Sequence, residues 1–130
     1  MLDNKDLVES ARKAMEYSYS PYSKFRVGAA LLSLDGKVFT GCNIENASFG
    51  GTNCAERTAL FKAVSEGNLK FSKIAIISDS EDYISPCGIC RQVLAEFGLD
   101  MDVIMAKLNG EYKVMKVRDL LPLAFTGEDL

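Results

Sequence analysis

The 130-residue sequence contains no histidine, no tryptophan and only three prolines. Without histidine, any zinc site must be built without imidazole ligands. Long apolar runs are also missing: runs such as 27–32 are the length of a strand, far below the roughly 20 residues of a membrane span. Basic residues are not in excess, since 15 Lys and Arg face 18 Asp and Glu and no basic cluster occurs. We therefore predict neither a nucleic-acid nor a membrane partner.

The length and composition are those of one globular domain over residues 1–130, with 48% hydrophobic and 25% charged residues. A chain of this size buries enough surface to fold without disulfides. Asp3, Asp6 and Glu9 interrupt the first fifteen residues, so no signal peptide is predicted and a cytoplasmic location is expected. In a reducing compartment, the four cysteines point to metal binding or catalysis rather than to disulfides.

The hydrophobic periodicity predicts eight helices and strands in the order α-β-β-α-β-α-β-β. The expected elements are a helix from Asp3 or Asn4 to near Ser20, strands 27–34 and 37–42, helix 54–66, strand 74–78, helix 88–97, and strands 101–108 and 111–117. Two-residue turns at Asp35-Gly36 and Asn109-Gly110 make the first and last strand pairs antiparallel hairpins. The two middle helices form parallel crossovers, so an α/β fold of three layers (α/β/α) with a mixed five-stranded sheet is predicted.

Three cysteines lie where two predicted helices begin. Cys54 opens the second helix, and Cys87 and Cys90 lie three residues apart in the first turn of the third, on one face. Helix N-termini carry partial positive charge, which favours thiolates. Three thiolates that meet there would hold Zn²⁺ and leave one position open for water, which is the pattern of catalytic rather than structural zinc.

Two residues near Cys54 bear on the chemistry of this zinc site. Glu56 follows Cys54 by two positions and can face the open coordination position as a proton shuttle, which suits hydrolytic deamination of an amidine-like ring carbon. Zn²⁺ with three thiolates sums to a charge of −1, so a positive group is needed. We predict that Arg57, on the face of Cys54, hydrogen-bonds the sulfurs and supplies that charge. Arg91, which follows Cys90 directly, is the other positive group near the cysteines, but it could equally be a surface charge and we assign it no role.

Five stretches of the chain together resemble the small, homotetrameric zinc-dependent cytidine deaminases. They are Gly41-Cys42-Asn43-Ile44-Glu45-Asn46, Cys54-Ala55-Glu56-Arg57-Thr58-Ala59, Pro86-Cys87-Gly88-Ile89-Cys90-Arg91-Gln92, Tyr22-Ser23-Lys24-Phe25 and Val27-Gly28-Ala29-Ala30. The resemblance spans nearly the whole chain, and the zinc-deaminase signature accepts a third cysteine in place of histidine. It implies a cytidine-deaminase-like fold, one Zn²⁺ per subunit, a homotetramer with shared active sites, and hydrolysis of cytidine and deoxycytidine to uridine, deoxyuridine and ammonia in pyrimidine salvage.

The resemblance also implies a role for individual residues. By similarity Cys54, Cys87 and Cys90 are the zinc ligands, Glu56 is the catalytic proton shuttle, Asn43 and Glu45 bind the ribose hydroxyls, Phe25 lies near the base, Phe125 comes from a neighbouring subunit, and main-chain groups of Ala55 and Cys87 contact the pyrimidine edge. One departure is Phe49, where relatives often carry tyrosine.

Each of these residues has a plainer interpretation. Cys87 and Cys90 alone would fit a redox pair or half of a structural zinc site, and Cys42 is either a buried apolar residue or a fourth ligand that closes the site. Asn43 could cap a turn, Glu45 could be a solvated carboxylate, Phe25 could belong to the core and Phe125 to the packing of the tail.

Three other classes of function share the zinc motif. A polynucleotide deaminase would need a basic surface and stacking aromatic residues, which this acidic chain lacks. A deaminase of another free base or nucleoside analogue fits the same scaffold. A non-catalytic zinc module would leave Glu56 without a purpose.

Overall fold

The fold is seen in a computed structural model that describes residues 2–130. Its helices and strands are α1 (Asn4–Met15), β1 (Val27–Ser33), β2 (Val38–Cys42), η1 (Phe49–Gly51), α2 (Ala55–Ser65), β3 (Phe71–Ser78), α3 (Gly88–Phe97), β4 (Asp102–Ala106), β5 (Tyr112–Lys116), α4 (Val117–Leu120) and η2 (Gly127–Asp129). The strands form one sheet in the order β2-β1-β3-β4-β5. The predicted mixed five-stranded sheet is confirmed.

The direction of each strand follows from its connection. The hairpins β1–β2 and β4–β5 are antiparallel, β1 and β3 are also antiparallel, and β3 and β4 are parallel. Since β1 lies between β2 and β3, the crossover through α2 joins two strands that run in the same direction, as does the crossover through α3. Both helices therefore begin at the same edge of the sheet, which is the arrangement the site requires.

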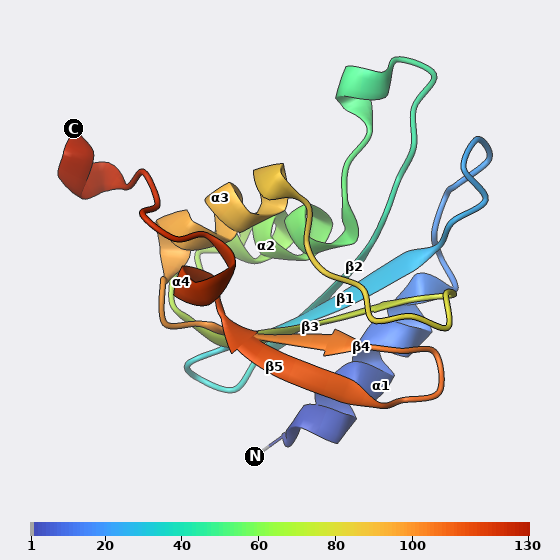
Figure 1. Cartoon of the computed structure of the whole chain (residues 1–130), viewed down its shortest axis with the longest axis horizontal. Coiled ribbons are helices and arrows are strands. Elements are labelled where there is room, and N and C mark those ends of the chain that lie inside the picture. The colour runs from blue at the N-terminus through green and yellow to red at the C-terminus, as the bar shows by residue number, and fades with distance from the viewer. Residues whose placement is uncertain (1) are drawn as a thin grey trace.

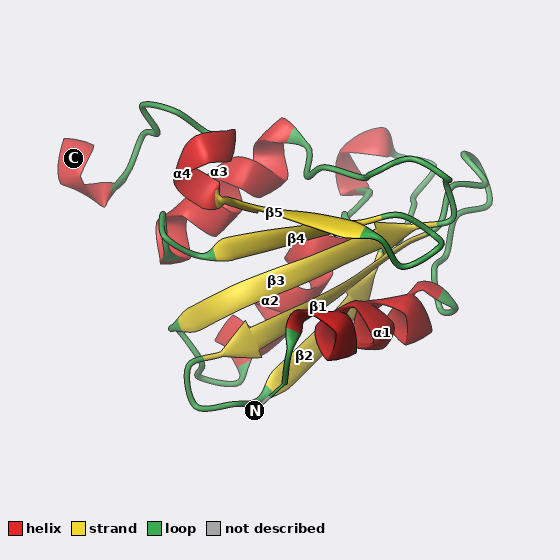
Figure 2. Ribbon diagram, turned by 60° about the horizontal axis from the view of Figure 1, so that its bottom comes forward, coloured by secondary structure: helices red, strands yellow, loops and turns green. Residues whose placement is uncertain are grey.

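Helices cover both faces of the sheet (Figures 1 and 2). Strand β1 shows why, because alternate residues point to opposite faces. Ala30 and Leu32 pack under α1, whereas Ala29 and Leu31 pack under α2 and α3. All seven residues of β1 are buried, as expected for a strand between two helical layers.

Gly41 allows α2 to approach the sheet closely. A Cβ atom at Gly41 would lie 2.5 Å from the backbone nitrogen of Ala59 and 2.6 Å from the carbonyl oxygen of Ala55. Any side chain there would push α2 outward. Because Cys54 and Glu56 sit at the N-terminus of α2, this contact helps to set their position.

The structure extends the sheet at one point and shortens it at others. Strand β3 begins at Phe71, three residues before the predicted start, because Phe71 pairs with Ser33 and is buried. Val117 belongs to α4 rather than to the last strand. These shifts change the ends of elements and leave the topology as predicted.

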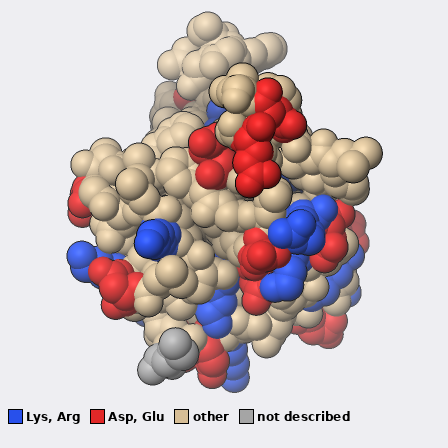
Figure 3. Space-filling model, turned by 90° about the vertical axis from the view of Figure 1, so that its left-hand side faces the viewer, with Lys and Arg blue, Asp and Glu red and all other residues tan. Residues whose placement is uncertain are grey.

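The charges on the surface are mixed. On the face drawn in Figure 3, Lys and Arg form small groups with Asp and Glu close by, and neutral surface separates them. This face presents no continuous basic stripe of the kind that follows a nucleic-acid backbone. Among the described helices, none is long and apolar enough to cross a membrane.

Candidate active site

Two helix N-termini bring three sulfur atoms together. Cys54 and Cys87 are the N-cap residues of α2 and α3, both with extended backbone, and Cys90 lies in the first turn of α3. The Sγ atoms of these three residues, called here the cysteine cluster, all lie within 4.8 Å of one another. The Sγ atoms of Cys54 and Cys87 are 3.7 Å apart. The predicted convergence of the three thiols is confirmed.

The cysteine cluster fits a zinc ion. In a tetrahedral site with Zn–S bonds of 2.3 Å, neighbouring sulfurs are about 3.8 Å apart, close to the distance between Cys54 and Cys87. Among residues 2–130, this is the one group of three or more Cys, Asp or Glu side chains that could hold a metal. Cys42 lies outside it, on β2 opposite Gly28, so a fourth cysteine ligand finds no support in the geometry.

The contact between the thiols of Cys54 and Cys90 shifts their pKa values in opposite directions. A hydrogen bond from the Cys90 side chain, with others from Arg57 and Cys87, lowers the pKa of the Cys54 thiol to about 5. The pKa of Cys90 is raised, first by that same contact with Cys54 and then by burial. Cys54 is therefore a thiolate at neutral pH even without a metal, a state that metal binding requires.

Glu56 is a buried carboxylic acid beside the cysteine cluster. Its side chain comes from the first turn of α2 and is only 4% exposed. Burial, together with the negative charge of Cys54, raises the pKa of Glu56 to about 7. A carboxyl group that gains and loses a proton near neutral pH is suited to general acid–base catalysis.

Arg57 contacts the cysteine cluster from the same helix. Its Nη2 donates a hydrogen bond to Sγ of Cys54 at 3.4 Å. The contacts with Cys54 and Cys90 raise the pKa of the guanidinium above its ordinary value, so the positive charge is permanent. The Nε of Arg57 is buried and has no hydrogen-bond partner among the described residues.

A cavity of about 220 Å³ opens onto Glu56 and two members of the cysteine cluster, Cys54 and Cys87. It is lined by Phe25, Val27, Asn43, Thr52, Asn53, Cys54, Ala55, Glu56, Ile84, Ser85 and Cys87. Besides Cys54 and Cys87, four of the residues predicted from the sequence line this cavity: Phe25, Asn43, Ala55 and Glu56. Glu45 does not line it. Phe125 is not among the lining residues of this chain.

Asn43 is buried at the wall of the cavity and fixed by three hydrogen bonds. Its Oδ1 accepts from the hydroxyl of Ser18 at 2.5 Å and from the backbone N–H of Val27 at 2.9 Å, and its Nδ2 donates to the carbonyl of Phe25 at 2.8 Å. An asparagine amide has two N–H donors, so one remains for a ligand. Asn43 therefore supports the wall and can still donate.

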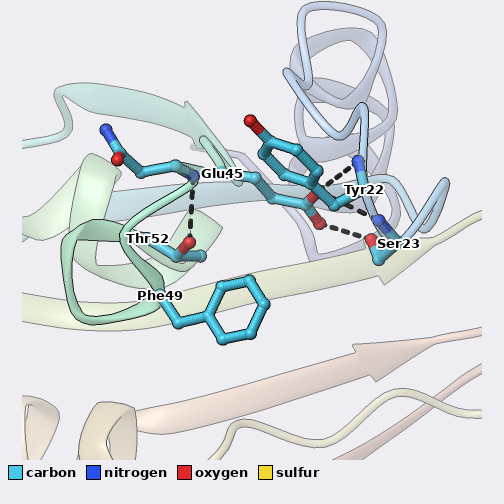
Figure 4. A pocket seen from close by; sticks show the side chains of 6 residues that line it. Tyr22, Ser23, Glu45, Phe49 and Thr52 are labelled. Carbon is cyan, nitrogen blue, oxygen red and sulfur yellow. Dashed lines mark hydrogen bonds between the residues drawn. The ribbon is translucent and has the colours of Figure 1, made fainter.

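Glu45 lies on the neighbouring cavity, about 440 Å³, which shares Thr52 with the first. Figure 4 shows its carboxylate held by the loop that carries Tyr22 and Ser23, while Phe49 lies opposite. The backbone N–H groups of Tyr22 and Ser23 donate to Oε1 at 3.0 and 3.1 Å, and the Ser23 hydroxyl bonds Oε2. These bonds lower the pKa of Glu45, which keeps it ionised.

The segment that carries Asn43 and Glu45 is tied to the site by the residue between them. Ile44 exchanges two backbone hydrogen bonds of 2.9 Å with Asn53, the residue before Cys54. On the other side, Tyr19 bonds the backbone of Asn43 and Glu45 at 3.0 and 2.8 Å. This short ladder fixes the segment against the start of α2.

The remaining candidates are Phe25, Ala55 and Phe125. Phe25 is 40% exposed at the cavity mouth, so it is not a core residue, and Ala55 is fully buried in the first turn of α2. Phe125 is 59% exposed in the C-terminal tail, where its carbonyl accepts a hydrogen bond of 2.8 Å from Gln92.

Sequence reasoning missed five residues that line the cavity, Val27, Thr52, Asn53, Ile84 and Ser85. Ile84 carried a signal, since it is the one large aliphatic residue in the polar loop 79–86.

Three convergent thiols and one buried carboxyl group in a cavity define a site of the zinc-hydrolase type. Residues 1–107 match the family model of the cytidine and deoxycytidylate deaminase zinc-binding region. The chain belongs to this family.

Two relatives of similar length carry the name cytidine deaminase. The protein of Sporosarcina psychrophila is 52% identical over 99% of this chain and 96% of its own length. That of Halalkalibacterium halodurans is also 52% identical, over 99% of this chain and 98% of its own. A crystal structure of cytidine deaminase from Burkholderia pseudomallei superposes with a TM-score of 0.92 at 48% identity, covering 95% of this chain and all of that one. The predicted three-layer, cytidine-deaminase-like fold is confirmed.

Proposed function

We propose that this chain catalyses the hydrolytic deamination of cytidine and deoxycytidine to uridine and deoxyuridine with release of ammonia. The observation that carries the proposal is the buried carboxyl group of Glu56, which lines the same cavity as Cys54 and Cys87 of the cysteine cluster. A structural zinc site gains nothing from a buried acid whose pKa is raised to about 7. The two relatives that are 52% identical to this chain carry the name cytidine deaminase, which agrees with this activity.

Zinc would be held by Cys54, Cys87 and Cys90, and when bound it supplies a Lewis acid that activates water. Glu56 takes a proton from the attacking water and returns it to a nitrogen of the cytosine. Its burial serves this purpose, because a pKa near 7 allows both halves of the transfer. Arg57 donates to the sulfur of Cys54 and offsets the negative charge of three thiolates.

The walls of the two cavities suit a nucleoside. Phe25 at the mouth packs against the base, and main-chain groups of Ala55 and Cys87 contact the pyrimidine edge. The free N–H of Asn43 and the ionised carboxylate of Glu45 bind the ribose hydroxyls. A carboxylate in the sugar site repels a 5′-phosphate, so the nucleoside is favoured over the nucleotide.

The working protein in this proposal is a homotetramer built from a single deaminase domain, residues 1–130, and it acts in pyrimidine salvage in the cytoplasm. Phe125, exposed in the tail and absent from the cavity of its own chain, is available to the active site of a neighbouring copy. Neither nucleic acid nor membrane is a partner. Dilution that separates the subunits should then reduce activity.

The test follows the loss of ultraviolet absorbance when zinc-loaded protein meets cytidine, deoxycytidine, CMP, adenosine or guanine. Turnover of the two cytosine nucleosides alone supports the proposal. Turnover of CMP but not of cytidine would contradict the role given to Glu45. Turnover of guanine or adenosine instead would favour a deaminase of another base, and no turnover at all by protein with zinc would favour a non-catalytic zinc module.

A further inference from the structure

The side chain of Arg91 joins two parts of the molecule that are far apart in sequence. Its Nε donates to the carbonyl of Pro86 and its Nη1 donates to the carbonyl of Leu120, both at 2.8 Å. Arg91 is half-buried, and none of the ion pairs among residues 2–130 involves it. Of the possibilities left open for Arg91, a free surface charge does not describe these two contacts.

The first contact holds the peptide that precedes Cys87. Pro86 is buried, whereas Cys87 is exposed and its side chain makes no capping hydrogen bond to α3. The backbone N–H of Arg91 also donates to the carbonyl of Cys87 at 3.0 Å. One residue thus holds the carbonyl groups of Pro86 and Cys87, the two that bracket the Cα atom of Cys87. The bond to Cys87 is the ordinary first backbone bond of α3, whereas the bond to Pro86 is specific to the arginine side chain and fixes the peptide that leads into Cys87.

The second contact holds the start of the C-terminal tail. Leu120 is the last residue of α4, and its carbonyl is one of those that a helix end leaves without an internal partner. The next residue along α3, Gln92, donates to the carbonyl of Phe125 at 2.8 Å. Consecutive side chains of α3 therefore anchor the tail at its beginning and five residues later. Figure 1 shows the tail leaving the sheet beside α3.

We infer that Arg91 is a positioning residue that couples the zinc ligand Cys87 to the C-terminal tail. The planar guanidinium can donate from Nε and Nη1 at the same time in two fixed directions. A lysine ammonium at this position would keep the charge but could not reproduce that pair of directions. Retention of zinc and order of the tail therefore depend on the same side chain. The inference rests on the zinc site of the proposed function but not on its substrate.

The test compares the zinc-loaded Arg91→Lys and Arg91→Met proteins with wild type, and uses Arg12→Lys as a control. Arg12 forms a surface ion pair with Glu9 on α1, away from the cluster. Zinc affinity is measured by competition with a chromophoric chelator, and hydrogen exchange of the backbone N–H groups in the segment 121–126 (all but Pro122) is measured by mass spectrometry. We expect both Arg91 variants to bind zinc about tenfold more weakly and to exchange these amides several times faster, while Arg12→Lys changes neither.

If Arg91 had a merely structural role, its variants would have a lower thermal midpoint than wild type but the same zinc affinity and the same tail exchange. That result would overturn the inference. So would a change in only one of the two readouts. If the Arg91 variants do not fold, wild-type protein provides the test: removal of zinc must accelerate exchange at residues 121–126, and unchanged exchange would overturn the coupling. Wild-type protein that binds no zinc would instead contradict the proposed function.

Discussion

The Nη2 atom of Arg57 lies 3.4 Å from the sulfur of Cys54 and donates a hydrogen bond to it. Both side chains come from the start of α2, so the positive group that a three-thiolate site requires is supplied by the same turn that supplies the first thiolate. Their mutual effect is visible in the lowered pKa of Cys54 and the raised pKa of Arg57.

Replacing Arg57 should alter the pH dependence of activity. Without the guanidinium, the site becomes more negative and loses protons less readily, so we expect Arg57→Ala to retain zinc but to shift the acidic limb of the kcat/KM profile upward by about one pH unit. Arg57→Lys, which keeps a positive charge, should shift the limb less. The measurement is the pH–rate profile with zinc content determined in parallel. An unchanged profile would remove Arg57 from the mechanism.

Gly41→Ala should disturb the site from a distance. The new methyl group would overlap the backbone of Ala55 and Ala59, which forces α2 and Cys54 outward. We expect a loss of about 1–3 kcal/mol in the free energy of unfolding and weaker zinc binding, measured by denaturant titration and chelator competition. Gly50→Ala is the matched control, because a Cβ there has no atom within 4 Å. If the two variants had the same stability and zinc affinity, Gly41 would not set the position of α2.

The Asn43→Asp variant tests whether Asn43 only supports the cavity wall or also binds the ligand. The carboxylate still accepts from Ser18 and Val27, but it can no longer donate to the carbonyl of Phe25 or to a ligand. We expect a destabilisation of about 1–3 kcal/mol and a raised KM for cytidine, measured by denaturant titration and steady-state kinetics. Asn109→Asp, in an exposed turn, should change neither. A destabilised variant with unchanged KM would assign Asn43 to structure alone.

Glu56 should make the zinc-free protein less stable as pH rises. Its pKa in the folded state, about 7, lies above the ordinary value of 4.5, so the folded protein binds the proton more tightly than the unfolded chain. The resulting stabilisation is fully present below pH 4.5 and is lost as pH rises through 7, by about 3 kcal/mol in total.

Glu56→Gln removes this dependence. The free energy of unfolding is measured for both proteins by urea titration of reduced, chelator-treated samples. As pH rises from 4.5 to 8, the wild-type value should fall relative to that of the variant. The subtraction cancels the contribution of the Cys54 thiol to first order. Parallel stability curves for the two proteins would show that the carboxyl group is not buried as described.

The sequence predicted those parts of the molecule that depend on local spacing. Helix α3 begins and ends as expected, since Cys87-Gly88 and Gly98 delimit it, and the cysteine cluster follows from two helices that start at one sheet edge. Strand β3 was predicted too short because Ser72 and Lys73 are polar. Their place in the sheet comes from pairing with neighbouring strands, which the local pattern does not reveal.

Contacts between distant segments were beyond sequence reasoning. The backbone ladder of Ile44 with Asn53 sets the cavity wall, and it depends on the conformation of the whole loop between them. The bond from Arg91 to Leu120 joins residues 29 positions apart. A lone arginine after a cysteine looks like any surface charge until the tail is placed beside it.

The most direct test measures zinc content and cytidine turnover together in Glu56→Gln and wild-type protein. Glutamine keeps the size of the side chain but cannot carry a proton between water and substrate. We expect one zinc per subunit in both proteins, and a turnover in the variant at least 10²-fold lower than in wild type. A variant that binds zinc and still deaminates cytidine at the wild-type rate would contradict the central role of this buried carboxyl group.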